Sequence, residues 1–261
     1  MTLNYAHRGY SSKFPEDTML AFDQAVRTPG CDGISIDVQM SKDGVPVIIH
    51  DVTLNRTCTN MTGKIRAYNL DQLKKAEVSA EYEGQYVPQY VPTLREYLEF
   101  IRPLGKKTIL ELKTETYEYE GLEQKVVDLL KEFDLIDRTI VASCNHYSVR
   151  RVKELCPELK CGLLSHSWIV DGEKYVKDYV GVDCYMPNFG QCTAEMVKRY
   201  HDAGVEVYTW TANEEVDIEH LINVGVDGII TDFPDQVTRY RRFAEIEDDY
   251  PMSMAVCGWA D

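Results

Sequence analysis

Residues 205–231, VEVYTWTANEEVDIEHLINVGVDGIIT, place one helix-length segment between two short apolar runs. The runs 205–210 and 227–231 have the length and the β-branched content of strands. Between them, residues 214–224 carry apolar side chains at helical spacing. Two such strands joined by a helix predict a parallel βαβ unit.

Residues that start and end helices flank this unit and the segment before it. Thr193 and Asn213 are predicted to cap the first turns of two helices. Gly204 and Gly225 stand where a left-handed glycine ends a helix. Each of these helices therefore leads directly into a strand.

The same alternation extends back through most of the 261 residues. Seven further strands are predicted at 3–7, 33–38, 45–50, 108–112, 139–143, 160–164 and 182–185. The other predicted helices are 17–27, 93–101, 119–133, 147–155, 193–203 and 235–243. About eight strand–helix units over some 250 residues predict an α/β fold, a TIM (β/α)8 barrel. An open, doubly wound sheet is the alternative.

One stretch interrupts the alternation. Residues 51–91 are polar, and only 70–76 has a helical pattern. We interpret 51–91 as a small insertion after the second-strand region, within a single barrel domain of residues 1–244. Residues 245–261 are predicted to be a peripheral acidic C-terminal tail.

Composition limits the classes of function. Lys and Arg number 28 and Asp and Glu 43, so the formal net charge is −15. That charge argues against nucleic-acid binding and against docking on anionic membranes. No apolar run reaches the ~18–20 residues of a transmembrane helix, and the first residues lack the pattern of a signal peptide. We therefore expect a cytoplasmic protein without a stable membrane anchor. The eight scattered cysteines form no CxxC pair, which favours free thiols.

Polar side chains gather at the predicted strand ends, which in a barrel meet at one rim. They are His7 and Arg8, Ser35 and Asp37, His50 and Asp51, Glu111 and Lys113, Trp210, and Asp232. Carboxylate oxygens suit a hard divalent cation, Arg and Lys suit phosphate, and His moves protons near neutral pH. Each residue alone is more often an ordinary polar residue, but together they predict a phosphodiester site.

Six stretches resemble the glycerophosphodiester phosphodiesterase family. They are AHRGYSSKFPEDTMLAF (6–22), DGISIDVQMSKDGVPVIIHDVTLNRT (32–57), VPTLREYL (91–98), ILELK (109–113), VEVYTWTANE (205–214) and VDGIITDFPD (226–235). Their order and spacing span nearly the whole chain. The resemblance implies a TIM barrel with a small insertion, in agreement with the pattern of strands and helices.

The resemblance also implies roles at matching positions. His7 and His50 match the catalytic histidine pair, which acts as general base and general acid. Arg8 and Lys113 match phosphate-binding residues, and Trp210 matches a residue that lines the pocket on the glycerol side.

A metal site is implied as well. Asp37 and Glu111 match ligands of one divalent cation, Mg²⁺ or Ca²⁺, and Glu16 matches a supporting glutamate. The family's second strand usually reads Glu-x-Asp, and here Ser35 takes the place of that ligand glutamate. A hydroxyl is neutral and shorter than a carboxylate, so weaker metal binding and lowered activity are expected.

Other rim residues have two interpretations. His146 either contacts substrate or only begins a helix, and Asp51 either orients His50 or begins the insertion. Asp232 is either a hydrogen-bonding group of the rim or a cap for the following turn. The remaining histidines, His166, His201 and His220, are predicted to be surface residues.

The expected activity is hydrolysis of a small glycerophosphodiester to sn-glycerol 3-phosphate and an alcohol. One alternative is an impaired barrel that only binds a phosphodiester or phosphate, which Ser35 supports. Another is a lysophospholipid phosphodiesterase, for which the Tyr-rich residues 82–90 could line the pocket mouth. The sequence predicts no oligomeric state.

Overall fold

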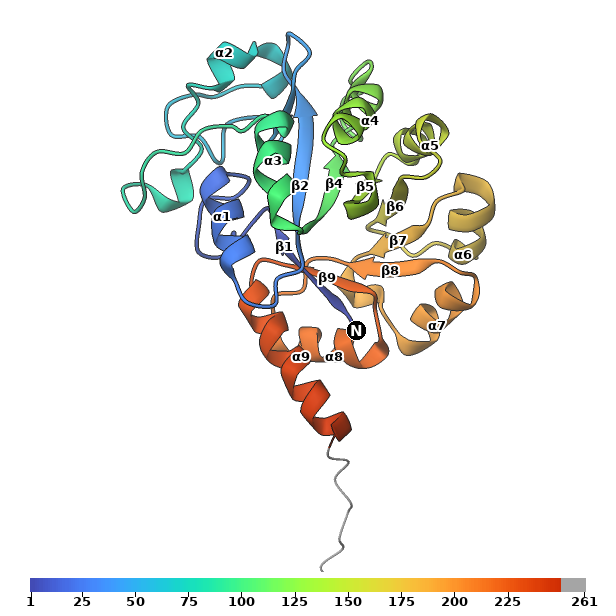
Figure 1. Cartoon of the computed structure of the whole chain (residues 1–261). Coiled ribbons are helices and arrows are strands. Elements are labelled where there is room, and N and C mark those ends of the chain that lie inside the picture. The colour runs from blue at the N-terminus through green and yellow to red at the C-terminus, as the bar shows by residue number, and fades with distance from the viewer. Residues whose placement is uncertain (250–261) are drawn as a thin grey trace, which may run out of the picture.

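The structure, a computed structural model, describes residues 1–249, with side chains through Arg241. Eight parallel strands close into a barrel, and β1 pairs with both β2 and β9 to complete the ring (Figure 1). The barrel strands are β1 (Leu3–His7), β2 (Gly33–Met40), β4 (Lys107–Leu112), β5 (Thr139–Ser143), β6 (Lys160–Ser165), β7 (Cys184–Pro187), β8 (Glu206–Thr209) and β9 (Gly228–Thr231). The predicted TIM barrel is confirmed, and the open sheet is excluded.

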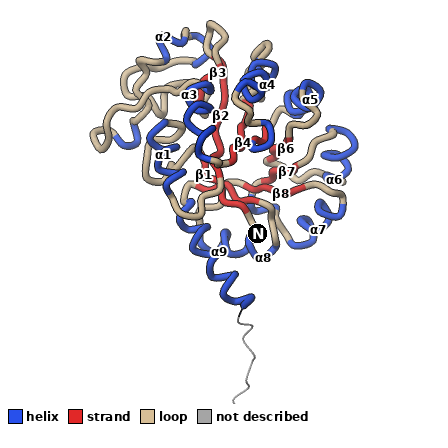
Figure 2. Tube along the Cα trace, viewed as in Figure 1, coloured by secondary structure: helices blue, strands red, loops and turns tan. Residues whose placement is uncertain are grey.

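Helices surround the barrel on its outside (Figure 2). They are α1 (Met19–Arg27), α2 (Leu70–Leu73), α3 (Leu94–Ile101), α4 (Leu122–Glu132), α5 (His146–Leu155), α6 (Gly172–Lys174), α7 (Ala194–Asp202), α8 (Glu215–Val224) and α9 (Pro234–Asp249). A π-helical segment, Tyr175–Val180, follows α6. The sequence pattern missed this element between β6 and β7.

Two apolar layers hold the barrel together. Alternate side chains of the strands fill its interior, among them Tyr5, Ile109, Met186 and Tyr208. The opposite faces of the strands pack against the helices in one continuous core. Because β2 is covered on both faces, all eight of its residues are buried. The strand ends are thus held rigidly at the rim.

One predicted strand has a different role from the others. Residues 45–50 contain β3 (Pro46–Ile48), which pairs antiparallel with β2 and is not one of the barrel strands. β2 runs past the rim, turns, and β3 returns, so that Ile49 donates its backbone N–H to the Asp37 carbonyl at 2.9 Å. His50 therefore reaches the rim through a hairpin and not, as the sequence predicts, at the end of a regular strand.

The insertion packs around its own small apolar cluster. Leu54, Cys58, Ile65, Leu73 and Val78 are buried there, together with Val47 of β3. On its barrel side, Tyr82 and Tyr86 donate hydroxyl hydrogen bonds to the Ser11 and Lys13 carbonyls, both at 2.8 Å. The insertion is therefore fastened to the loop that follows β1.

The helix-boundary predictions had mixed outcomes. Thr193 caps α7 by accepting the Met196 N–H, and Gly204 and Gly225 have left-handed φ angles of 71° and 79°. The prediction for Asn213 was wrong, because α8 begins after Glu214 without a side-chain cap. Asn213 instead forms hydrogen bonds with residues at the end of β9, as described below.

The C-terminal part of the chain is only partly described. Residues 245–249, predicted as the start of a peripheral tail, continue helix α9, and 250–261 lie outside the described residues. No helix within the described part of the chain is long and apolar enough to cross a bilayer. The seven cysteines that precede this end are free thiols.

Candidate active site

A cleft of about 350 Å³ opens at the carboxyl ends of the barrel strands. The side chains that line it come from almost every strand of the ring. They are His7, Arg8, Ser35, His50, Ile109, Glu111, Lys113, Glu115, Cys144, Leu164, His166, Trp210, Thr211 and Ile230. Most of the residues predicted from the sequence therefore do meet at one site.

His7 stands at the end of β1 with its ring fixed by a carboxylate. Its Nδ1 lies 2.8 Å from Asp232 Oδ1. The Ser11 hydroxyl is 2.8 Å from the same oxygen, and Asn213 Nδ2 donates to Asp232 Oδ2 at 2.6 Å. Although burial opposes its ionisation, these partners lower the pKa of Asp232 to about 2. Asp232 is thus an ionised rim group that orients His7.

His50 is fixed in the same manner, just after the hairpin strand that pairs with β2. Its Nδ1 lies 2.8 Å from Asp51 Oδ1. The buried Gln39 holds the backbone here, because its amide lies 2.7–3.0 Å from the carbonyl oxygens of residues 49, 50 and 51. Burial, the largest effect, and the nearby Arg8 and Lys113 charges lower the pKa of His50.

The two carboxylates also fix the histidine tautomers. An ionised Asp232 or Asp51 can only accept a hydrogen bond, so it favours the proton on Nδ1 of its histidine. Each Nε2 is then free to accept or donate a proton. Lys113 Nζ lies 3.4 Å from His50 Nε2, which places that nitrogen among the charged groups of the cleft.

Arg8 enters the cleft from a tight turn after β1. Arg8 and Gly9 have φ angles of 56° and 80°, and a Cβ at Gly9 would lie 2.6 Å from the Ala21 backbone. Glycine therefore lets this turn sit against α1. The Arg8 guanidinium contacts Glu16 Oε1 at 3.0 Å and Asp37 Oδ2 at 3.2 Å.

Lys113 and Glu111 lie two residues apart, across the end of β4, and form an ion pair. Lys113 Nζ is 2.8 Å from Glu111 Oε1 and 3.3 Å from Glu115. Burial works against the charge of Lys113, but the surrounding carboxylates raise its pKa. Burial and the neighbouring Asp37 raise the pKa of Glu111 to about 7. Lys113 therefore stays charged and presents its ammonium group to the cleft.

Of the three positions predicted to hold a cation, two are carboxylates, Asp37 and Glu111, which are register partners on β2 and β4. Among the described residues, no group of three His, Cys, Asp or Glu side chains is arranged to hold a metal ion. Asp37 and Glu111 are each paired with a buried cation, Arg8 and Lys113 respectively. Ser35 lines the cleft but offers only a hydroxyl. Two carboxylates, with waters and a substrate phosphate, are enough for Mg²⁺ in many sites, so this donor set fits a weaker cation site than three carboxylates would make.

The aromatic side of the cleft is formed by Trp210 and His166. Trp210 donates its indole N–H to the Met186 carbonyl at 2.9 Å, and the His166 ring stands edge-on to it at 4.7 Å. His166 was predicted to be a surface residue; it is exposed, but it also borders the cleft. His146 begins α5, and its Nδ1 lies 3.0 Å from the Tyr175 hydroxyl. His146 is not among the cleft-lining residues.

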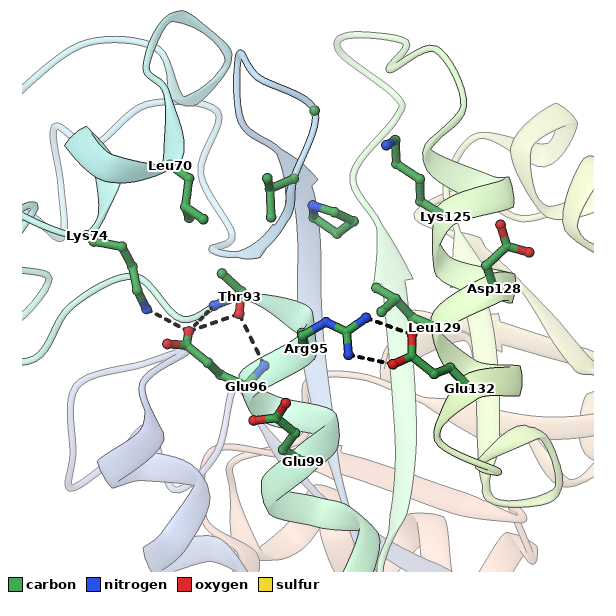
Figure 3. Close-up of a pocket in the computed structure, with 13 residues that line it drawn as sticks. Leu70, Lys74, Thr93, Arg95, Glu96, Glu99, Lys125, Asp128, Leu129 and Glu132 are labelled. Carbon is green, nitrogen blue, oxygen red and sulfur yellow. Dashed lines mark hydrogen bonds and ion pairs between the residues drawn. The ribbon is translucent and has the colours of Figure 1, made fainter.

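A larger hollow, of about 560 Å³, lies on the outer side of the barrel between the β2–β3 turn, α2, α3 and α4. Its charged side chains are largely paired with each other. Figure 3 shows Arg95 of α3 donating to both Glu132 oxygens at 2.6 Å, and Lys74 donating to Glu96. It contains none of the rim residues, and its paired charges give it no evident chemistry.

Sequence reasoning missed several residues that hold the site together. Ser11, Gln39 and Asn213 carry no charge and match no strand-end pattern. Arg56 lies in the irregular insertion, yet its guanidinium contacts both Glu16 and Asp51. The one signal available in advance was that Gln39 follows Ser35 and Asp37 at alternate positions of the same strand, which places all three on one face.

A TIM barrel whose rim carries two carboxylate-oriented histidines, an arginine and a lysine defines a class of acid–base enzyme that acts on a phosphorylated substrate. The comparisons with known proteins agree. Residues 7–236 match the model of the glycerophosphoryl diester phosphodiesterase family. The chain belongs to this family.

Relatives match along nearly their full length. A glycerophosphodiester phosphodiesterase of Bacillus altitudinis is 36% identical over 244 residues, which cover 92% of this chain and 98% of that protein. One from Caldanaerobacter subterraneus is 37% identical, with 90% and 95% covered. The structure of an Oleispira antarctica phosphodiesterase in complex with the product sn-glycerol-3-phosphate is 28% identical, covers 93% of this chain and 97% of that one, and has a TM-score of 0.83.

Proposed function

We propose that this protein hydrolyses small glycerophosphodiesters to sn-glycerol 3-phosphate and an alcohol, with His7 and His50 as the acid–base pair. The observation that carries the proposal is the matched geometry of the two histidines. Each has Nδ1 2.8 Å from a carboxylate oxygen, and both rings line one cleft. Family membership and the product-bound relative support the substrate class.

The reaction follows from what these side chains can do. One histidine accepts the proton of the glycerol 2-hydroxyl as that oxygen attacks phosphorus. The other donates a proton to the alcohol oxygen as its bond to phosphorus breaks. Water then opens the cyclic phosphate, with the proton-transfer roles reversed. Asp232 and Asp51 stabilise whichever imidazole carries the extra proton.

Arg8 and Lys113 supply the positive charge for the phosphate. Arg8 presents a planar fork to phosphate oxygens, and Lys113 acts as a point charge. Both are largely buried, with side chains 16% and 10% exposed, so their charges act in a poorly solvated cleft. They stabilise the negative charge that grows on the non-bridging oxygens when phosphorus is attacked.

Members of this family typically use a divalent cation. Here Asp37 and Glu111 would hold Mg²⁺ or Ca²⁺, with the Ser35 hydroxyl in place of a third carboxylate. When bound, the ion would stabilise negative charge on a phosphoryl oxygen, while the proton transfers above belong to the two histidines. This interpretation favours a reduced rate relative to a barrel with a third carboxylate, because part of the usual charge stabilisation is missing.

The alternative of a barrel that only binds phosphate rests on Ser35 alone. All the other charged and histidine side chains of the site are present and interconnected. For the lysophospholipid alternative, Tyr82 and Tyr86 pack on the loop after β1 and do not line the cleft. Among the described residues, these tyrosines therefore lend the lysophospholipid alternative no support at this cleft.

The test is release of glycerol 3-phosphate from glycerophosphocholine in the presence of Mg²⁺, of Ca²⁺ and of a chelator. The wild-type protein and the Ser35→Glu variant are measured side by side, with Ser35→Ala as the matched control. We expect turnover by the wild-type protein and a metal-stimulated rate in Ser35→Glu. If no variant releases glycerol 3-phosphate from this or other glycerophosphodiesters, the phosphate-binding alternative replaces the proposal.

A further inference from the structure

We propose that Arg56, in the insertion, is a positioning residue that holds both halves of the site in place. This inference rests on the proposed function. Arg56 does not itself line the cleft, yet its guanidinium bridges two carboxylates. Each of these carboxylates orients a different residue of the proposed chemistry.

The first carboxylate is Asp51, which fixes the ring of His50. Arg56 Nε donates to Asp51 Oδ2 at 2.9 Å and Nη2 to Oδ1 at 3.0 Å. The same Asp51 Oδ1 also forms the hydrogen bond with His50 Nδ1. Although burial raises it, the pKa of Asp51 is lowered to about 2 by Arg56 and His50. Arg56 therefore helps keep the partner of His50 ionised and in place.

The second carboxylate is Glu16, which contacts Arg8. Arg56 Nη2 and Nη1 donate to Glu16 Oε1 and Oε2 at 2.6 and 2.8 Å. Glu16 Oε1 in turn lies 3.0 Å from Arg8 Nη1. Glu16 is largely buried, with its side chain 12% exposed, so its geometry is well defined. Arg56 therefore also fixes the carboxylate that aims the phosphate-binding Arg8.

The network differs from an ordinary surface ion pair. Arg56 is 39% exposed, and a single pair at that exposure contributes little to stability. Here one planar guanidinium spans two carboxylates bidentately, and its Nη1 also reaches Glu81 at 3.2 Å. Lysine cannot reproduce that fork. The arrangement sets geometry more than it adds stability.

The insertion does not depend on Arg56 to stay docked. Tyr82 and Tyr86 bond to the loop after β1, and Gln39 holds the backbone of residues 49–51. The insertion also has its own buried cluster. Loss of the Arg56 side chain should therefore disturb the orientation of His50 and Arg8 while the fold persists.

The experiment compares Arg56→Ala and Arg56→Lys with Arg95→Ala. Arg95 also forms a bidentate pair, with Glu132, but lies on the outer hollow (Figure 3). Glycerol 3-phosphate release is measured with and without added guanidinium, and melting temperatures are recorded. We expect kcat to fall about 10- to 100-fold in Arg56→Ala, the usual range when an orienting partner is lost. KM should rise because Arg8 is released, and guanidinium should restore part of kcat. Arg56→Lys should remain impaired, and Arg95→Ala should keep wild-type kinetics.

Three results would overturn the inference. These are wild-type kinetics in Arg56→Ala, a loss of rate that guanidinium does not relieve, and full activity in Arg56→Lys. If Arg56→Ala fails to fold, Arg56→Lys carries the test, because it keeps the charge. An inactive wild-type protein would instead contradict the proposed function, so the two failures are distinguishable.

Discussion

The two histidines of the site reach it from unlike regions of the molecule. His7 ends a regular barrel strand, and its carboxylate, Asp232, ends the neighbouring strand β9 and is held by the neutral donors Ser11 and Asn213. His50 follows a hairpin strand outside the ring, and its carboxylate, Asp51, is held by the charged Arg56. The same histidine–carboxylate unit is therefore built once by the barrel and once by the insertion.

The difference indicates how each half of the site is stabilised. The barrel half depends on the register of two paired strands, which the whole ring enforces. The insertion half depends on side-chain bonds from Gln39 and Arg56 to a short irregular segment. Changes in supporting residues should therefore affect His50 more selectively than His7.

The largest effect is expected when either imidazole is removed. His7→Ala and His50→Ala should each lower kcat by about 10²- to 10⁴-fold, because each loses one proton-transfer group. Both variants should retain the wild-type circular dichroism spectrum, since both side chains line a solvent-accessible cleft. Initial rates on glycerophosphocholine measure the effect. Near-normal rates in both variants would remove the acid–base assignment.

Removing the carboxylates distinguishes the two halves. Asp232→Asn and Asp51→Asn should each reduce kcat by about 10- to 10³-fold, because the tautomer is no longer fixed. Combined with Arg56→Ala, the Asp51→Asn effect should be strongly non-additive, whereas the Asp232→Asn effect should add. A double-mutant cycle on kcat makes the comparison. Equal coupling of Arg56 to both carboxylates would contradict the separation of the two halves.

A third carboxylate should change cation binding. Ser35→Glu adds a negative charge beside Asp37 and Glu111, so we expect Ca²⁺ or Mg²⁺ affinity to rise about tenfold or more. Isothermal titration of each ion into the wild-type, Ser35→Glu and Ser35→Ala proteins measures binding independently of turnover. Tight stoichiometric binding by the wild-type protein would show that two carboxylates suffice here.

The smallest expected effect concerns stability in acid. Asp51 and Asp232 have pKa values lowered to about 2 in the folded protein, against about 3.9 when unfolded. Each therefore stabilises the fold above pH ~4, by about 1 kcal/mol after allowance for exposure, and this stabilisation disappears as the pH falls towards 2. Urea unfolding of the wild-type protein, Asp51→Asn and Asp232→Asn at pH 6 and pH 3 measures the free energy of unfolding. Each variant should be less stable than the wild-type protein at pH 6, and the difference should be smaller at pH 3.

The contributions of Asp51 and Asp232 to stability should also respond differently to salt. The contribution of Asp51 comes partly from a charged and half-exposed partner, so 1 M salt should reduce it. The contribution of Asp232 depends on the neutral donors Ser11 and Asn213 as well as on His7, and it should fall less. A stability difference that is independent of both pH and salt would mean that neither carboxylate acts through its charge.

The sequence predicted the barrel half of this site better than the insertion half. A strand that ends in His7 and a neighbour that ends in Asp232 follow from periodicity, because parallel strand ends must meet at one rim. The hairpin that carries His50 was read as a regular strand, since three residues of antiparallel β3 look like any short apolar run. Periodicity specifies faces, but it does not specify strand direction.

The supporting contacts were beyond reach for a different reason. Asn213 has the residue type of a helix cap, and only the closeness of β9 shows that it bonds to Asp232. Arg56 and Glu16 are 40 positions apart, and their pairing depends on how the insertion folds back. Such contacts depend on how distant segments meet in the folded chain, and no local sequence pattern indicates this. The charged residues of the strand ends, by contrast, are brought together by the ring itself.

The most direct test of the account is a crystal structure of the protein with glycerol 3-phosphate bound. We predict that the phosphate lies in the rim cleft, with its oxygens within hydrogen-bonding distance of Nε2 of both His7 and His50 and of the Arg8 and Lys113 side chains. A phosphate bound away from either histidine, or in the outer hollow near Arg95, would contradict the claim that the barrel and the insertion build a single catalytic site.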